Sequence, residues 1–200
     1  MVAVIFDLGN VLVRLWPERG LARLRRLVPG LDRELAWLQA LPEVEAVARG
    51  ALDGPAFLEA LARRLGTRAP LDELREVWCD TFEPWPEMEA LAESVIASGT
   101  ATYLASNTDP LHYAYLAARM PVLARMTGLH LSYEVGAFKP ERAFYEGALA
   151  RFGLVAGQCL FLDDRPENVD GARAVGLEAR VFDGDVAAAR ELLRARGVAL

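Results

Sequence analysis

Lysine and asparagine are almost missing from this chain. It contains 21 arginines but a single lysine, Lys139, and its only asparagines are Asn10, Asn107 and Asn168. Arginine is a planar fork, whereas lysine carries a compact charge that can sit end-on against an oxyanion. Because the chain otherwise uses arginine for its cations, we infer that Lys139 occupies a place where arginine will not serve. The rare polar residues therefore point to a polar site.

Cysteine and histidine are also scarce, with two residues of each in the whole chain. Cys79, Cys159, His112 and His130 are too few, at these spacings, for a structural zinc site. The cysteines lie in or next to apolar stretches, and a buried free thiol is the ordinary state of such a residue in a cytoplasmic protein. We expect both histidines to be structural rather than catalytic.

Long apolar runs and basic stretches are missing as well. A net charge of −6 and a pI near 5.1 argue against a general nucleic-acid binder, which would carry a basic face. No apolar run approaches the ~18 residues of a membrane span. The start of the chain has no basic segment and reaches a carboxylate at Asp7, unlike a signal peptide. We expect a cytoplasmic protein that binds neither nucleic acid nor membrane; these residues do not indicate an oligomeric state.

Short apolar runs alternate with helical patterns along most of the chain. The runs are typical of strands buried on both faces, and they cover residues 2–6, 101–105, 129–135, 159–162 and 179–182. Helices are predicted at residues 86–97, 110–119, 140–152, 166–175 and 186–196. Four of these five helices open on proline, the residue favoured at the first helical position. The alternation predicts an α/β fold with a parallel five-stranded sheet.

A long segment after the first strand breaks this alternation. It has no convincing strand but holds amphipathic helical patterns at residues 19–27, 32–41, 44–48, 55–65 and 71–79. We predict a helical domain at residues 16–81, inserted into a core formed by residues 1–15 and 82–200. Four tryptophans lie in this insert or at its borders, and we expect most of them to form its small core: Trp16, Trp37, Trp78 and Trp85.

Polar residues follow the predicted strands at their carboxyl ends, where open α/β sheets bind their ligands. They are Asp7, Gly9 and Asn10 after the first strand, Ser106 and Asn107 after the second, and Asp163, Asp164 and Asn168 after the fourth. Lys139 comes a few residues after the third strand. If these strand ends are neighbours in the fold, the three aspartates crowd together.

Aspartates gathered in this way constrain the chemistry. Two like charges about 4 Å apart repel by roughly 4 kcal/mol at an effective dielectric near 20, so the cluster holds either a proton or a cation. Oxygen ligands without nearby histidine or cysteine favour a hard ion such as Mg²⁺, which leaves positions for phosphate. With Lys139, Ser106 and Asn107 added, the residues form a clamp for a phosphoryl group. Asp7 is then free to act as a nucleophile.

Four short motifs in this order resemble a known family. Phe-Asp-Leu-Gly-Asn-Val-Leu at residues 6–12, Ser106-Asn107, Lys139-Pro140 and Asp163-Asp164 with Asn168 look like the motifs of the haloacid dehalogenase (HAD) superfamily of hydrolases. The resemblance implies a Rossmann-like core, and a helical insert after the first motif resembles the C1-cap subclass. The Asp-x-Gly-Asn form of the first motif resembles the branch that includes α-D-glucose-1-phosphatase.

The resemblance implies a role for each motif residue. Asp7 would be the nucleophile of a phosphatase that forms an aspartyl-phosphate. Mg²⁺ would be held by Asp7, the backbone carbonyl of Gly9 and Asp164. The phosphoryl oxygens of a small phosphorylated substrate would be held by Ser106, Asn107 and Lys139. The metal site would be supported from behind, without contact to the ion, by Asn10, Asp163 and Asn168.

Gly9 departs from the pattern of the family. Phosphatases of the family usually carry a second aspartate there, which protonates the leaving group and then activates water, and a positioned acid or base is typically worth ~10²–10⁴-fold. Three interpretations remain open. The chain is a phosphatase whose leaving group needs little protonation, as in a sugar 1-phosphate, or takes its proton from an insert residue or water. Alternatively it is a metal-independent 2-haloacid dehalogenase, or a phospho-ligand binding protein that has lost turnover.

Overall fold

Residues 3–200 are described by this computed structural model, so Val2 of the first predicted strand lies outside them. Five strands form one parallel sheet in the order β5-β4-β1-β6-β7. In that order their bounds are Gly128–Leu131, Thr102–Ser106, Ala3–Phe6, Cys159–Asp163 and Glu178–Val181. The predicted α/β fold with a parallel five-stranded sheet is therefore confirmed.

β1 lies at the centre of the sheet, paired in parallel on both sides. Phe6 stands opposite Leu104 of β4 and Leu162 of β6, and all of β1 is buried. The chain winds outward from β1 through β4 to β5, and then returns to continue through β6 to β7. Ligands of open sheets bind where the winding reverses in this way, outside the carboxyl ends of the strands.

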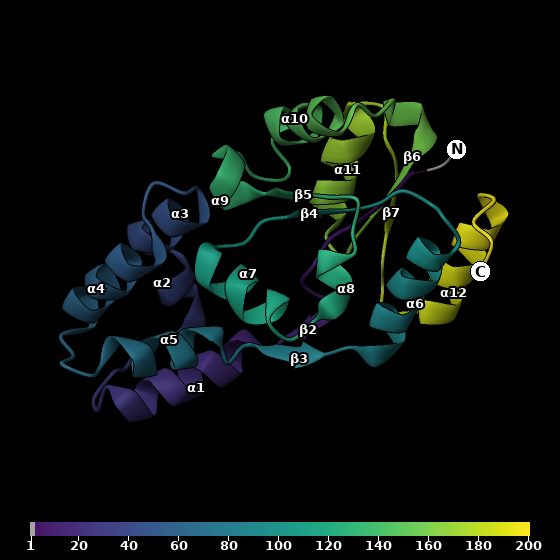
Figure 1. Cartoon of the computed structure of the whole chain (residues 1–200). Helices are drawn as coiled ribbons and strands as arrows, with labels where there is room; N and C mark the ends of the chain where they lie inside the picture. Colours follow the sequence, from purple (N-terminus) through teal and green to yellow (C-terminus); the bar gives the residue numbers. More distant parts are fainter. Residues whose placement is uncertain (1–2) are drawn as a thin grey trace.

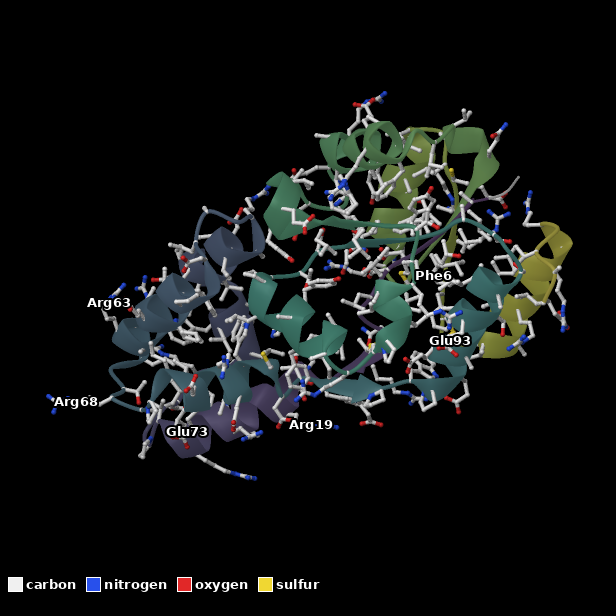
Figure 2. The ribbon with its side chains drawn as sticks, viewed as in Figure 1. Phe6, Arg19, Arg63, Arg68, Glu73 and Glu93 are labelled. Carbon is white, nitrogen blue, oxygen red and sulfur yellow. The ribbon has the colours of Figure 1, made fainter. Side chains whose placement is uncertain are left out.

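Helices cover both faces of the sheet (Figure 1). One apolar core joins the sheet to α6 (Pro86–Ala97), α7 (Pro110–Ala117), α8 (Pro121–Ala124) and α12 (Val186–Ala195). The other joins it to α10 (Arg142–Phe152) and α11 (Pro166–Ala174). Val4 and Phe6 of β1 belong to the first core and Ile5 to the second, as the two-residue period of a strand requires. Figure 2 shows Phe6 enclosed by sheet and helices.

Five helices between residues 17 and 79 form a lobe beside the sheet, drawn in purple and blue in Figure 1. They are α1 (Pro17–Leu27), α2 (Leu35–Gln39), α3 (Pro42–Ala48), α4 (Gly54–Leu65) and α5 (Leu71–Cys79). Their apolar faces meet in a third core around Phe57 and Leu74, both fully buried. Arg63 and Arg68 point outward from this lobe (Figure 2). We call residues 16–81 the insert.

Two short strands flank the insert, and the sequence analysis did not predict them. β2 (Val13–Leu15) and β3 (Phe82–Pro84) pair in antiparallel fashion, with Leu15 opposite Phe82. The chain therefore enters and leaves the insert at adjacent positions. Each strand has only three residues, which is too short for the alternation that marks a strand in sequence.

The strand predicted at residues 129–135 is wrong in its second half. β5 ends at Leu131, and Ser132–Val135 form the short helix α9 instead. The hydroxyl of Ser132 accepts the Thr108 N–H at 3.0 Å and donates to the Thr108 carbonyl at 2.8 Å. These two bonds satisfy backbone groups that a continued strand would have paired, so the chain turns there into a helix that ends at Gly136, which has a left-handed backbone.

Three predicted helices are clearly shorter than expected, and the one predicted at residues 32–41 spans only Leu35–Gln39. The helix predicted from residue 140 begins at Arg142, because the Glu141 N–H donates to the Phe138 carbonyl at 2.7 Å and closes a turn first. The helix predicted at residues 110–119 ends at Ala117, and α8 follows as a separate helix. Within residues 3–200, no helix has the length and apolar character that crossing a membrane requires.

The prediction that most tryptophans form the core of the insert is wrong. Trp37 and Trp78 do pack against it. Trp16 is 46% exposed, and Trp85 packs instead on Phe182 of the sheet domain, with ring centroids 5.5 Å apart. Trp16 and Trp85 each stand at the N-cap of a helix that opens on proline. They therefore lie outside the amphipathic repeats whose apolar faces build the core of the insert.

Candidate active site

A buried lysine lies between two aspartates at the carboxyl end of the sheet. The Nζ atom of Lys139 is 2.7 Å from Oδ1 of Asp7 and 2.7 Å from Oδ2 of Asp163. Only 1% of the lysine side chain is exposed. Residues that are far apart in the sequence are thus brought together. We call Asp7, Lys139, Asp163 and Asp164 the carboxylate centre.

Strand pairing places the two aspartates side by side. β1 and β6 are adjacent and parallel, with Phe6 opposite Leu162, so Asp7 and Asp163 are the next residues on neighbouring strands. The Asp7 N–H donates to the Leu162 carbonyl at 2.9 Å, which continues the ladder one step beyond β1. The backbone position of Asp7 is therefore fixed by the sheet itself.

Asp163 uses both carboxylate oxygens within the protein. Its Oδ1 accepts the Asn168 amide and the Arg165 N–H, each at 2.9 Å, and its Oδ2 accepts from Lys139. The residue is 0% exposed. Asp163 thus holds the lysine, and Asn168 in turn holds Asp163.

Asn10 ties together the loops that follow β1 and β6. Its backbone has φ of 53°, in the left-handed region that asparagine tolerates better than most residues. Its side-chain amide donates to Oδ2 of Asp164 at 3.0 Å, and its side-chain oxygen accepts the Leu15 N–H at 3.0 Å. This position needs a donor, an acceptor and left-handed backbone at once, and asparagine offers all three.

Asn107 contacts the backbone of Lys139 rather than another side chain. Its amide donates to the Lys139 carbonyl at 2.9 Å, and its side-chain oxygen accepts the Lys139 N–H at 2.8 Å. The pair of bonds fixes the backbone from which the lysine reaches the aspartates. A contact between Asn107 and phosphate stays a prediction. Ser106 ends β4 and is 2% exposed.

The carboxylate centre carries an excess of negative charge. Burial raises the pKa of Asp7 to about 6; Lys139 acts in the opposite direction, and Asp163 adds to the rise. Burial also raises the pKa of Asp164. One carboxylate oxygen from each aspartate lies within 4.8 Å of the others, and Oδ1 of Asp7 makes no hydrogen bond of good geometry beside its ion pair. This oxygen-only set fits a hard divalent cation such as Mg²⁺.

The comparison with protein families agrees with this geometry. Residues 1–176 match the family model described as haloacid dehalogenase-like hydrolase. The chain belongs to the haloacid dehalogenase-like hydrolase family. The resemblance inferred from four motifs is thereby confirmed at the level of the superfamily, and the protein is a hydrolase. Its membership of the C1-cap subclass and of the glucose-1-phosphatase branch stays a prediction.

Two relatives of this HAD-like hydrolase are named phosphatases. Phosphatase MT3486 of Mycobacterium tuberculosis is 27% identical over 190 residues, which cover 90% of this chain and 87% of the relative. Sesquiterpene phosphatase astK of Aspergillus oryzae is 25% identical over 193 residues, which cover 95% and 94%.

A solved structure shares the fold of this HAD-like hydrolase. The HAD family enzyme bt-2542 of Bacteroides thetaiotaomicron, in complex with magnesium and inorganic phosphate, has a TM-score of 0.84 at 19% identity. The match covers 92% of this chain and 96% of that one. At this level of identity the likeness shows the fold alone.

Gly9 of this HAD-like hydrolase leaves room for a side chain. A Cβ atom built there would have Cδ2 of Leu15 as its nearest contact, at an ordinary 3.7 Å. Its backbone is not among the positive-φ positions of the described chain. Neither packing nor backbone conformation therefore requires glycine. The fold therefore does not impose the absence of a second aspartate at this position.

A cavity of about 300 Å³ lies between the carboxyl end of the sheet and the insert. Gly9, Ser106 and Asn107 line it from the sheet, and α1 to α5 supply most of the remaining wall. We call it the insert cavity. Ser106 and Asn107, which we predicted to bind phosphate, thus line the same cavity as the helices of the insert. The sequence predicted these helices but not their position relative to the sheet.

The sequence did not predict a contact between α7 and α5 that lies at this cavity. Oδ2 of Asp109 is 2.7 Å from Nδ1 of His112 and accepts from the Trp78 indole at 3.1 Å, while Nε2 of His112 lies 2.9 Å from the Trp78 carbonyl. Burial alone would lower the pKa of His112, but the Asp109 carboxylate more than offsets this and raises it. When it is protonated, the ring can donate on both sides, and its contacts join the sheet domain to the insert. The sequence feature that could have indicated this contact is the helix start at Asp109-Pro110, with His112 in the first turn of the helix.

Proposed function

We propose that this HAD-like hydrolase is a Mg²⁺-dependent phosphomonoesterase that acts through an aspartyl-phosphate on Asp7. The observation that carries the proposal is the buried Lys139 between Asp7 and Asp163, beside the third carboxylate of Asp164. This centre combines a nucleophile, a fixed positive charge and an oxygen-donor cation site. The phosphatase names of both relatives, and the magnesium and phosphate of the structural neighbour, support it.

Asp7, Asp164 and the Gly9 carbonyl would hold the magnesium ion. Asp163 is less suited because both of its oxygens are engaged by protein donors. Asp164, by contrast, accepts a side-chain bond from Asn10 on Oδ2. Burial raises the pKa of both Asp7 and Asp164, and a bound cation would counter this rise. The bound ion would supply charge that stabilises the phosphoryl oxygens in the transition state.

The reaction consists of two displacements at phosphorus in this proposal, with Asp7 as the nucleophile of the first and the leaving group of the second. One of its carboxylate oxygens attacks phosphorus, the bond to the ester oxygen breaks, and the alcohol leaves with a proton from water. A water molecule then attacks the aspartyl-phosphate, releasing inorganic phosphate and the free carboxylate. Lys139 opposes the effect of burial on the pKa of Asp7, which favours an ionised nucleophile at neutral pH. Lys139, the Ser106 hydroxyl and Asn107 hold the phosphoryl oxygens.

Gly9 restricts the alcohol that can leave. Without a positioned acid, the first step relies on water for the proton, so esters of weakly basic alcohols should react best. The anomeric hydroxyl of a sugar 1-phosphate meets this requirement, and a small phosphorylated metabolite of this kind was the substrate expected from the motifs. Neither relative is named for a sugar phosphate: one name gives no substrate, and the other gives a sesquiterpene.

We further propose that the insert acts as a C1-type cap that selects the substrate and excludes water. It lines the cavity next to Gly9 and Ser106. Arg49 at the end of α3 reaches the sheet domain, with Nη2 2.6 Å from Oε1 of Glu141 and Nη1 3.1 Å from the Gly136 carbonyl. The boundaries at residues 16 and 81, and a cytoplasmic location, stay predictions.

A panel of phosphate esters, assayed with and without Mg²⁺, tests the proposal on the wild type and on Asp7→Asn. We expect phosphate release that requires the metal and falls by on the order of 10⁴–10⁶-fold in Asp7→Asn, which keeps the shape of the side chain but removes the nucleophile. Asp170→Asn is the matched control, because Asp170 lies on the surface in an exposed pair with Arg173. It should leave the rate unchanged.

Two other results would replace the proposal. Release of halide from 2-chloropropionate without metal would indicate a dehalogenase, which the absence of an acid at Gly9 allows but which leaves the Asp163-Asp164 pair without a role. Tight binding of phosphate esters without turnover would indicate a binding protein.

A further inference from the structure

The insert gives its cavity an apolar wall. Among the residues that line it from α1, α2, α4 and α5 are Leu24, Leu38, Leu61, Leu74 and Val77, each less than 10% exposed. These side chains also belong to the apolar core of the insert. One side of the core of the insert therefore borders the cavity. A ligand that entered from the phosphate site would meet hydrocarbon.

The polar groups of the wall are few, and several are already paired. Asp109 and His112 bind each other and Trp78, so they are not available to ligand hydroxyl groups. Ser106 and Asn107 lie at the sheet end, where the phosphoryl group is proposed to bind. Three further polar side chains line the cavity without a hydrogen-bond partner among residues 3–200, Gln39, Thr81 and Thr108, and of their polar atoms only the Thr81 hydroxyl oxygen is fully buried.

We propose that the substrate is a phosphate ester of a largely apolar alcohol, whose hydrocarbon part fills the insert cavity. The inference rests on the proposed phosphatase function and narrows its substrate class. A sugar would bury several hydroxyl groups against leucine and valine without partners, which is unfavourable. An alkyl or aryl group would be buried at a gain of affinity, and the Thr81 hydroxyl can accept or donate one hydrogen bond to a single polar group on it.

Size and position both agree with this occupant. The cavity of about 300 Å³ lies at the lower end of the roughly 300–1,000 Å³ of small-molecule sites, so it fits one compact hydrocarbon group. Gly9 and Ser106 line the cavity; Gly9 follows Asp7 by two residues, and Ser106 ends β4, the strand that pairs with β1. An ester with its phosphoryl group beside Lys139 can therefore extend its organic group into the insert.

The test separates hydrocarbon length from leaving-group basicity. A series of 4-alkylphenyl phosphates, from phenyl to 4-pentylphenyl, keeps a phenol as the leaving group, which like tyrosine has a pKa near 10. We expect kcat/KM to rise about fourfold per methylene, since about 0.8 kcal/mol per buried CH₂ converts at tenfold per 1.4 kcal/mol. The rise should stop when the cavity is full, and α-D-glucose 1-phosphate should be a poorer substrate than 4-pentylphenyl phosphate.

A variant that fills the cavity gives the second measurement. Ala48 of α3 lines the cavity and Ala46 of the same helix does not, so Ala48→Leu and Ala46→Leu form a matched pair. Ala48→Leu should abolish most of the advantage of the pentyl chain over phenyl phosphate. Ala46→Leu should retain the full dependence on chain length. If Ala48→Leu does not fold, the series on the wild type decides alone.

The two proposals fail in different ways. Metal-dependent hydrolysis of phenyl phosphate with no dependence on alkyl length, or with glucose 1-phosphate as the better substrate, would overturn the apolar substrate and leave the phosphatase intact. An absence of phosphate release from every ester would overturn the phosphatase and this inference with it.

Discussion

The carboxylate centre and the insert cavity lie next to each other and are built in opposite ways. In the centre, buried charges are held by charge-assisted bonds, such as the two 2.7 Å contacts of Lys139. In the cavity, leucine and valine side chains form a wall with few free polar groups. The first region holds atoms at fixed distances, which a reaction needs. The second offers area and shape, which recognition of an organic group needs.

This difference shows how strongly each of the two regions depends on single residues. Directional bonds need particular residue types at single positions, so a change there is expected to be costly. Apolar contact is spread over many side chains of five helices, so a change at one of them alters fit by a small step. If this contrast is correct, single substitutions in the carboxylate centre should have larger effects than substitutions at the surface or in the insert.

Lys139→Met should damage the carboxylate centre most. It leaves Asp7 and Asp163 buried next to each other without their shared cation, and removal of one partner from a buried ion pair costs about 3–5 kcal/mol. We expect a loss of that size in the free energy of unfolding, measured by urea titration with chelator present, together with loss of phosphatase activity. Arg142→Met, which removes an exposed pair with Glu146, should cost less than about 1 kcal/mol. Equal losses in the two variants would contradict the contrast.

Gly9→Asp should add the missing acid at the border between the two regions. The position has space for a side chain, so the protein should fold, and a positioned acid should raise kcat/KM by roughly 10²-fold for esters of strongly basic alcohols. Esters of weakly basic phenols should gain little, because they need no proton. Leaving-group series measured on both proteins would show this as a flatter dependence in the variant.

Gly157→Asp is the control for that experiment, since a Cβ atom there meets nothing within 4 Å. It adds the same charge at another site and should leave the leaving-group dependence as steep as in the wild type. A wild-type dependence that is already flat would show that another group supplies the proton.

His112→Gln tests the contact through which the two regions meet. The pKa of His112 is raised by Asp109, against the effect of burial, so the folded protein binds this proton more tightly than the unfolded chain. The resulting stability is fully present below the unfolded pKa near 6.5 and is lost as the pH rises through the folded pKa. We expect His112→Gln to lower the free energy of unfolding by about 1–3 kcal/mol at pH 5.5 and by less at pH 9.

His130 provides the opposite case within the sheet domain. Burial, and after it the charge of Arg151, lowers its pKa to about 4, so the unfolded chain binds this proton more tightly. The cost of His130→Gln should therefore grow as the pH rises from about 4 to 6.5. Parallel pH trends in the two variants, measured by urea unfolding, would show that the Asp109–His112 pair does not carry a proton.

Arg49→Ala should have the smallest effect. Arg49 joins α3 to Glu141, but both side chains are about one-third or more exposed, and exposed pairs contribute less than about 1 kcal/mol. Thermal unfolding should therefore shift little. An effect as large as that of Lys139→Met would mean that the surface contact, rather than the buried centre, holds the two domains in register.

Rare residue types made the carboxylate centre predictable. Lys139, Asn10 and Asn168 stood out because the chain uses lysine and asparagine so sparingly, and each occupies a position where geometry excludes the common substitutes. The sheet was predictable because its strands are continuous apolar runs. β2 and β3 were not, because three residues show no period, and α9 was not, because the Ser132 hydroxyl replaces backbone partners in a way that only the fold reveals.

The substrate side was not predictable for the complementary reason. Leu24 or Leu74 in an amphipathic helix has the same pattern whether it packs against another helix or faces a cavity, since both places are apolar. Asn107 illustrates a second limit. Its residue type suggested a ligand contact, but its amide bonds to the backbone of Lys139, a choice set by a turn that the sequence does not specify.

Because Leu15 pairs with Phe82, the insert can change during evolution without moving the residues of the carboxylate centre. The insert leaves and rejoins the sheet domain at these two adjacent residues. A longer insert would therefore raise the entropy cost of loop closure only logarithmically, and β2 and β3 would stay in place. One ancestral carboxylate centre can in this way be combined with many different inserts, and none of them needs to alter the positions of the catalytic residues.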